Sequence, residues 1–143
     1  MIHKVSFDFD GCLSGLLVQL FAASLVKRDD VEVWIITSRA SEDNPPMYKQ
    51  NGVWVQIDNS DLFEVADSVG ISRDRIIFTN FADKWESIKD QGFTWHLDDD
   101  WHEIRSIDAN TECEGITNFG NPKWATMCKN LINYGAIKGR SMG

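Results

Sequence analysis

Two aspartates separated by one residue, Asp8 and Asp10, close an apolar segment near the start of the chain, and Gly11 follows at once. Side chains two positions apart on a strand point to the same face, so a regular strand would bring both carboxylates to one spot. Carboxylates that close repel each other unless a cation or a shared proton lies between them. The pattern therefore predicts a divalent-cation site, and Mg²⁺ favours such oxygen ligands. The alternative is a plain acidic turn, because Asp and Gly are both common in turns.

Other polar residues also follow apolar segments. Each has an ordinary structural explanation: a Thr-Ser pair is often a cap or turn, a lysine is usually solvated, and acidic residues favour helix starts. Ligands of open parallel sheets bind at the carboxyl ends of the strands, so the arrival of all these groups at such ends predicts one shared site. The groups are Thr37, Ser38 and Arg39 after one segment, Lys84 after a second, and Asp98 and Asp99 after a third.

The segments that must position these residues alternate between strand and helix patterns. Apolar runs predict strands at about residues 3–9, 31–37, 75–79, 93–97 and 113–117, with a short further strand at 53–57. Apolar spacing and capping patterns predict helices after residue 13 and at about 59–69, 83–90, 101–107 and 121–134. This alternation indicates an α/β fold, a three-layer Rossmann-like arrangement with a mostly parallel central sheet.

Some expectations concern the ends, the buried faces and the sheet positions of individual elements. The first helix is expected to begin at a cap, Ser14, and to bury one face. The run 75–79 is expected to be a central strand and 113–117 an edge strand, and the last helix is expected to carry Pro122 at its first position. The buried face of the first helix is expected to hold apolar residues at steps of three and four, namely Leu13, Leu16, Leu17, Leu20, Phe21 and Leu25.

The composition narrows the function. With 143 residues the chain is long enough for one domain, spanning 1–143, with a buried core. Its formal net charge of −8 disfavours a nonspecific grip on nucleic acid or an anionic membrane, which depends mainly on Lys and Arg, although a phosphorylated nucleic-acid end stays open as a substrate. No apolar run reaches the length of a membrane span. The three cysteines lack a metal-like spacing, which favours a reducing, cytoplasmic setting.

Four short motifs together resemble those of the haloacid dehalogenase-like (HAD) superfamily of phosphohydrolases. The first family motif is D-x-D-G-x-[TVL], which residues 8–13 satisfy at every defined position. The fourth is [GSD]-D with a further acid three or four positions on. The residues that carry the resemblance are Asp8, Asp10, Gly11 and Leu13, then Thr37, Ser38 and Arg39, then Lys84, and finally Asp98, Asp99 and Glu103.

The resemblance implies a Mg²⁺-dependent phosphatase. Asp8 would be the nucleophile that becomes an aspartyl-phosphate. Asp10 would protonate the leaving alcohol and then deprotonate water, while its backbone carbonyl helps to bind Mg²⁺. Thr37 would bind a phosphoryl oxygen, and Lys84 would neutralise charge on the nucleophile and the phosphate. Such chemistry needs mainly positioning and charge neutralisation, which a metal and a lysine supply.

The same resemblance assigns the remaining site residues. Asp99 would be the direct metal ligand with Asp98 in support, although the two could be exchanged, and Glu103 would be the outer acid. Ser38 and Arg39 would contact the substrate. Residues 40–79 leave no room for a second folded cap, so the chain resembles a capless member. Its loop at 40–51 is then expected to contact the substrate, unless it is an ordinary surface loop. Because a neighbouring subunit sometimes covers a capless site, a homo-oligomer is left open.

Two other classes compete with a phosphatase. A receiver domain also places acids, Thr and Lys around Mg²⁺, but its phosphorylated aspartate ends the third strand in the sequence, where this chain has Thr79 and Asn80. A non-catalytic phosphate- or metal-binding protein of HAD fold is the third class, and the intact acid pair argues against it. The substrate stays open among nucleotides, sugar phosphates and phosphorylated nucleic-acid ends, because fold does not set specificity.

Overall fold

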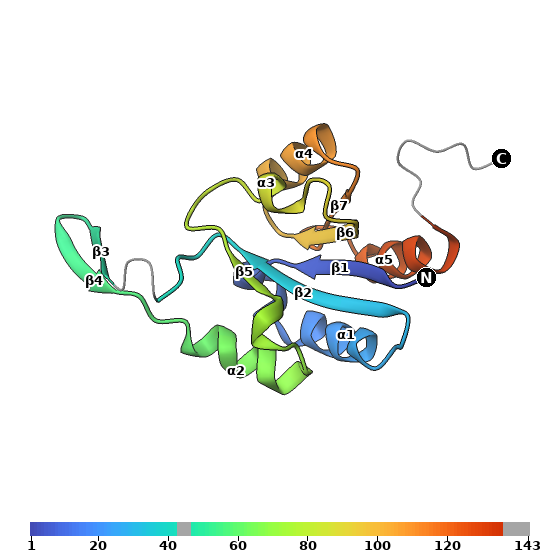
Figure 1. Ribbon diagram of the computed structural model, residues 1–143, viewed down its shortest axis with the longest axis horizontal. Helices are drawn as coiled ribbons and strands as arrows, with labels where there is room; N and C mark the ends of the chain where they lie inside the picture. The colour runs from blue at the N-terminus through green and yellow to red at the C-terminus, as the bar shows by residue number, and fades with distance from the viewer. Residues whose placement is uncertain (43–46, 136–143) are drawn as a thin grey trace.

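A five-stranded parallel sheet with helices on both faces forms the body of the protein (Figure 1). The computed structural model describes residues 1–42 and 47–135. Every ladder of this sheet is parallel, so the predicted α/β, Rossmann-like class is confirmed. In spatial order the strands are β5 (Ile76–Phe78), β2 (Val31–Thr37), β1 (His3–Phe7), β6 (Phe93–Asp98) and β7 (Glu114–Thr117).

The helices divide between the two faces of the sheet. On one face lie α1 (Leu16–Val26), α2 (Ser60–Val69) and α5 (Trp124–Tyr134), whose apolar residues share one buried cluster with β1, β2 and β6. On the other face α3 (Trp85–Ile88) and α4 (Trp101–Asn110) form a smaller cluster. The described elements also include two short helical turns, η1 (Phe9–Leu13) and η2 (Arg73–Arg75). No helix in the described part of the chain is long and apolar enough to span a membrane.

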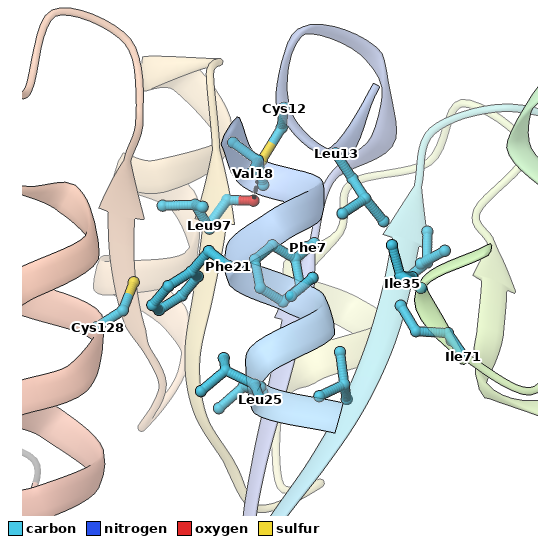
Figure 2. Packing of buried hydrophobic residues seen from close by; sticks show 14 of the residues in the cluster. Phe7, Cys12, Leu13, Val18, Phe21, Leu25, Ile35, Ile71, Leu97 and Cys128 are labelled. Carbon is cyan, nitrogen blue, oxygen red and sulfur yellow. Dashed lines mark hydrogen bonds between the residues drawn. The ribbon is translucent and has the colours of Figure 1, made fainter. Parts of the chain in front are cut away.

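The larger cluster fixes β1 and β6 side by side. Phe7 of β1 packs edge-on against Trp95 of β6, with ring centroids 5.3 Å apart, and Phe21 of α1 packs against both rings. Figure 2 shows Phe21 next to Phe7 in this cluster, with Leu97 near the start of α1 and Leu25 near its end. Since Asp8 directly follows β1 and Asp98 ends β6, this apolar packing determines where both carboxylates lie.

The first helix buries a different face from the expected one. Phe21 and Leu25 are buried as predicted, but Leu16, Leu17 and Leu20 are 69%, 74% and 60% exposed. The chain first passes through η1, so α1 begins only at Leu16, after Gly15, and Ser14 does not cap it. Because α1 carries apolar residues around most of its circumference, its periodicity could not select the buried side.

Residues 47–56 form a hairpin, of which the sequence predicted only the second strand, at about 53–57. Strand β3 (Met47–Gln50) pairs with antiparallel β4 (Val53–Gln56), and Asn51 and Gly52 both have positive φ at the turn, as a tight hairpin requires. The hairpin projects away from the main sheet (Figure 1). The expected irregular loop at 40–51 is therefore partly a strand. Its prolines at 45 and 46 lie outside the described residues.

Two further expectations about the elements are wrong. Strand β5 is an edge strand of the sheet, not a central one, because the chain enters it from α2 at the outer side of β2. Helix α5 begins at Trp124, so Pro122 lies in the preceding turn, where Asn121 Oδ1 accepts a hydrogen bond from the Lys123 N–H. The expected edge position of the strand at 113–117 is confirmed, since β7 closes the other side of the sheet.

Candidate active site at the carboxyl edge of the sheet

The predicted site residues converge on the edge of the sheet where β1, β2 and β6 end. Asp8 follows β1, Thr37 ends β2 and Asp98 ends β6, while Lys84 directly precedes α3. This is the edge at which parallel sheets bind ligands. A cavity of about 350 Å³ opens there. It is lined by Asp8, Asp10, Ser38, Lys84, Asp98, Asp99, Asp100 and Glu103.

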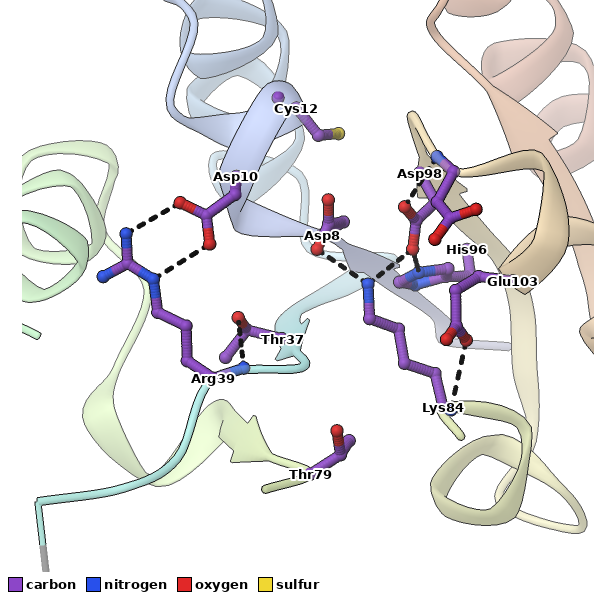
Figure 3. A network of polar contacts seen from close by, with 12 residues as sticks. Asp8, Asp10, Cys12, Thr37, Arg39, Thr79, Lys84, His96, Asp98 and Glu103 are labelled. Carbon is purple, nitrogen blue, oxygen red and sulfur yellow. Dashed lines mark hydrogen bonds and ion pairs between the residues drawn. The ribbon is translucent and has the colours of Figure 1, made fainter. Parts of the chain in front are cut away.

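Lys84 is buried and lies between two carboxylates, so it is not a solvated surface lysine. Its Nζ lies 2.7 Å from Asp8 Oδ1 and 2.6 Å from Asp98 Oδ2 (Figure 3). All three side chains are almost fully buried. The Lys84 backbone N–H donates to Glu103 Oε2 at 3.2 Å, so the predicted outer acid holds the start of α3 in place. A buried ammonium tied to two acids is fixed in position and retains its charge.

Asp8, Asp98 and Asp99 form a cluster that could hold a metal ion. Each offers a carboxylate oxygen, and the three oxygens lie within 4.8 Å of one another. An all-oxygen, strongly anionic donor set suits a hard cation such as Mg²⁺. One lysine does not balance three carboxylates, so the cluster has negative charge left for a cation. The residues present therefore fit the predicted metal.

Within the cluster the two adjacent aspartates are used differently. Asp98 Oδ2 contacts Lys84 and His96, and its Oδ1 accepts a hydrogen bond of 3.0 Å from the Asp100 N–H. The Asp99 carboxylate instead lies against Gly11: a Cβ at position 11 would come within 2.2 Å of Asp99 Oδ2. Asp98 is thus engaged by protein donors at both oxygens, which leaves Asp99 as the more available ligand.

Gly11 is required for two separate reasons. Its φ of 73° lies in the left-handed region, and its Cα faces the Asp99 carboxylate without space for a side chain. The turn is fixed by hydrogen bonds from Leu13 N to Asp8 O, 3.1 Å, and from Asn118 Nδ2 to Gly11 O, 3.0 Å. The glycine of the first motif therefore lets the chain turn away from β1 close to the acidic cluster.

Crowding of the carboxylates shifts their pKa values in opposite directions. Burial, reinforced by the charge of Asp98, raises the pKa of Asp8 to about 8, and Lys84 only partly opposes this. Burial also tends to raise the pKa of Asp98, but the hydrogen bond from His96 and the charge of Lys84 outweigh it and hold that pKa below its ordinary value. Without a metal, Asp8 is therefore mostly protonated near neutral pH, while Asp98 stays ionised. A bound cation would favour the carboxylate form of Asp8.

Sequence reasoning missed a buried pair behind Asp98. His96 Nε2 lies 2.8 Å from Asp98 Oδ2, and its Nδ1 lies 2.8 Å from Ser6 Oγ. Burial lowers the pKa of His96, so the ring is neutral; with an ionised carboxylate at Nε2, that nitrogen carries the hydrogen and Ser6 donates to Nδ1. His96 precedes Asp98 by two residues and Ser6 precedes Asp8 by two, so strand alternation could have revealed both.

The Asp10 carboxylate does not join the acidic cluster. Strand β1 ends at Phe7, earlier than expected, and Asp10 lies in the turn η1, so the two carboxylates do not share one spot on a regular strand. Arg39 holds Asp10 through Nε–Oδ2 and Nη2–Oδ1 contacts of 2.9 and 2.7 Å (Figure 3). The same guanidinium binds Asp61 of α2 at 2.7 and 2.9 Å. Any contribution of Asp10 to a cation would therefore come from its backbone carbonyl.

The remaining predicted substrate residues lie at the end of β2. Ser38 lines the cavity, while Thr37 is fully buried and its Oγ1 accepts a hydrogen bond of 3.2 Å from the Arg39 N–H. The backbone of this segment is tied to the loop after β5, because Phe81 N donates to Ser38 O at 2.8 Å. The expected contacts of Thr37, Ser38 and Arg39 with a substrate remain predictions.

No family model matches the chain, and no curated protein is significantly similar to it. The assignment of a function therefore rests on the residues and the geometry of this chain.

Proposed function

We propose that this protein is a Mg²⁺-dependent phosphomonoester hydrolase of the HAD type, acting through an aspartyl-phosphate on Asp8. The observation that carries the proposal is the position of Lys84, buried between Asp8 and Asp98 at the carboxyl edge of the sheet. A surface lysine would have no reason to be buried there. An ammonium held between two carboxylates, beside a third, supplies the charge neutralisation that transfer of a phosphate dianion to a carboxylate needs.

In the first step an Asp8 oxygen attacks phosphorus and the bond from phosphorus to the ester oxygen breaks. Lys84 offsets the charge of the nucleophile and of the phosphoryl oxygens. Asp10, which must enter this step as the carboxylic acid that the second step regenerates, donates its proton to the departing alkoxide, which leaves as an alcohol. To reach that oxygen, Asp10 must give up at least part of its contact with Arg39, and Asp61 keeps the guanidinium paired when it does.

In the second step water attacks phosphorus of the aspartyl-phosphate. Asp10, now a carboxylate, takes a proton from the water, the bond from phosphorus to the Asp8 oxygen breaks, and inorganic phosphate leaves. Thr37 uses its oxygen to accept the Arg39 N–H, so its hydroxyl hydrogen can be donated to a phosphoryl oxygen. Asp8 returns to its starting form, and the sum of the two steps is hydrolysis of the ester.

Asp8, Asp98 and Asp99 would hold the Mg²⁺. When bound, the ion supplies Lewis-acid stabilisation of charge on the phosphoryl oxygens. Two broader points stay predictions: a cytoplasmic location, which rests on the cysteine content, and a homo-oligomer that covers the open cavity. The receiver alternative gains no support, since Thr79 and Asn80 follow β5 where that class has its phosphorylated aspartate.

The test is hydrolysis of p-nitrophenyl phosphate by the purified chain. We expect activity with Mg²⁺, none with EDTA, and recovery when Mg²⁺ is added back. Asp8→Asn should abolish turnover, while Asp67→Asn, a change of the same type at an exposed residue of α2, should not. Full activity in EDTA, or in Asp8→Asn, would rule out the proposed chemistry.

A further inference from the structure

A second cavity, of about 510 Å³, opens beside the first. Arg39 and Asp61 line it, whereas Asp10 lines the first cavity, so the Asp10–Arg39 ion pair joins the two. The volume is within the range of sites for small molecules, about 300–1,000 Å³. Residues from three segments contribute: Ala40 after β2, residues 56–61 from the end of β4 to the first turn of α2, and Phe81 after β5.

The place of this cavity relative to Asp10 suggests what enters it, if the proposed phosphatase chemistry holds. The phosphoryl group would lie by Asp8 and Lys84, and the ester oxygen would lie by Asp10, which protonates it. Attacking and leaving oxygens are roughly in line in phosphoryl transfer. The group attached to the ester oxygen therefore continues past Asp10, toward Arg39 and the second cavity.

An aromatic side chain is held at the wall of this cavity. Phe81 is 69% exposed, and both it and Asn80 have positive φ, 68° and 53°, which is uncommon for a residue other than glycine. Hydrogen bonds from Phe81 N to Ser38 O, 2.8 Å, and from Asn80 N to Arg39 O, 3.2 Å, keep the backbone in this strained form. Such strain is concentrated at functional sites. Together with buried Ile57, the ring offers an apolar surface suited to a flat group.

The charges of the cavity exclude a second anionic group. Asp58 and Asp61 line it, and Arg39 is the one cation among its described lining residues. That guanidinium is already shared by Asp10 and Asp61. Another phosphate would meet uncompensated negative charge, whereas hydroxyl groups could donate hydrogen bonds to the two carboxylates.

We propose that this cavity binds the leaving group of a nucleoside monophosphate, with the base against Phe81 and the sugar hydroxyls toward Asp58 and Asp61. The flat base would pack on the apolar surface of Phe81, and the sugar hydroxyls would donate to the carboxylates. The absence of charge on this leaving group suits the excess negative charge of the cavity. A nucleoside diphosphate, whose leaving group still bears a phosphate, does not. A sugar phosphate lacks the ring and leaves the aromatic wall unused.

The first test compares kcat/KM for uridine 5′-monophosphate and ribose 5-phosphate, which differ by the base. Stacking of a base on an aromatic side chain is worth about 1–3 kcal/mol, so we expect a preference of roughly tenfold or more for the nucleotide. Phe81→Ala should lose most of this preference. Phe119→Ala is the matched control, because Phe119 is 67% exposed and follows β7, and it should keep the preference. Equal kcat/KM for both esters in the wild-type protein, or an undiminished preference in Phe81→Ala, overturns the proposal.

A second test uses charge. Uridine 5′-diphosphate should be hydrolysed much more slowly than the monophosphate. Asp58→Asn removes one negative charge but keeps an acceptor for the Ser60 N–H, so it should reduce the difference in rate between the two nucleotides. A diphosphate hydrolysed as fast as the monophosphate contradicts the proposed exclusion.

A third test does not depend on turnover. Uridine, which has no phosphate, is titrated into the ¹⁵N-labelled wild-type protein, and amide shifts at residues 56–61 and 81 are expected. Uridine binding there without any Mg²⁺-dependent hydrolysis would reject the phosphatase and leave the nucleoside site standing. Hydrolysis of p-nitrophenyl phosphate without shifts at these residues would reject the nucleoside site alone.

Discussion

Replacing Lys84 with methionine should destabilise the metal-free protein far more than a surface change does. Methionine keeps most of the volume of the aliphatic stem, so the substitution removes mainly the ammonium that lies 2.7 Å from Asp8 and 2.6 Å from Asp98. Breaking a buried ion pair costs about 3–5 kcal/mol, because a charge is left without a partner. At pH 7 Asp8, whose pKa is raised to about 8, is already mostly protonated, so the charge left without its ammonium partner is mainly that of Asp98. We therefore expect the lower end, about 3 kcal/mol.

Thermal unfolding at pH 7 in EDTA measures this cost. For a chain of this size about 1 kcal/mol corresponds to roughly 3 °C, so Lys84→Met should lower Tm by roughly 9 °C. Lys89→Met, at an exposed lysine just after α3, is the control and should change Tm little. Mg²⁺ should raise the Tm of Lys84→Met more than that of the wild-type protein, since the cation replaces the missing positive charge. Activity with p-nitrophenyl phosphate should fall at least tenfold, as about 1.4 kcal/mol of lost charge stabilisation already gives that factor.

Equal Tm values for Lys84→Met and Lys89→Met in EDTA would refute the reasoning about the buried ion pair. Equal activities with Mg²⁺ would separately return Lys84 to a structural role.

The remaining predictions concern four other residues of the site. In EDTA the raised pKa of Asp8 makes the folded state bind more protons than the unfolded state between about pH 4 and 8, so the free energy of unfolding should fall as pH rises through this window. Urea unfolding at a series of pH values measures this dependence, and Asp8→Asn should make it weaker. Asp10→Asn should slow turnover by about 10²–10⁴-fold while leaving the increase of Tm by Mg²⁺ intact, which steady-state kinetics and melting curves can check. His96→Phe should cost about 1–3 kcal/mol in chemical unfolding, because Asp98 and Ser6 lose a buried partner, whereas exposed His102→Phe should not. Gly11→Ala should cost at least about 1–2 kcal/mol for its positive φ and should also weaken Mg²⁺ binding, measured by calorimetry, because a Cβ displaces the Asp99 carboxylate.

The sequence was informative where the chemistry lies at the ends of strands. The sequence predicted a shared site for Asp8, Thr37 and Asp98, because parallel strands place their carboxyl ends at one edge of the sheet. Lys84 was grouped with them because it follows the end of another predicted strand, and the family resemblance supported that grouping. Nothing in its local sequence shows that a lysine before a four-residue helix is buried, because its burial depends on Asp8, which is 76 positions away.

Other features depend on contacts that periodicity cannot express. Helix α1 is apolar around most of its circumference, so its buried side is chosen by where η1 ends. The hairpin did have a local signal, since Asn51-Gly52 is a favoured tight turn between strands, and it was missed because the flanking segments are short. The pairing of Arg39 with Asp61, which lies 22 positions further along, had no such signal.

The double pairing of Arg39 bears on how the proposed acid becomes available. Asp10 and Asp61 are both well exposed, and exposed ion pairs contribute only about 0–1 kcal/mol. Asp10 can therefore leave the guanidinium at small cost, because Asp61 still neutralises it and no buried charge is left alone. A leaving group that enters the second cavity comes up against the same guanidinium. Entry of the leaving group and release of Asp10 toward the ester oxygen would then be coupled through the Arg39 side chain. The main role of Arg39 in the proposed catalysis would be to control when Asp10 can reach the ester oxygen.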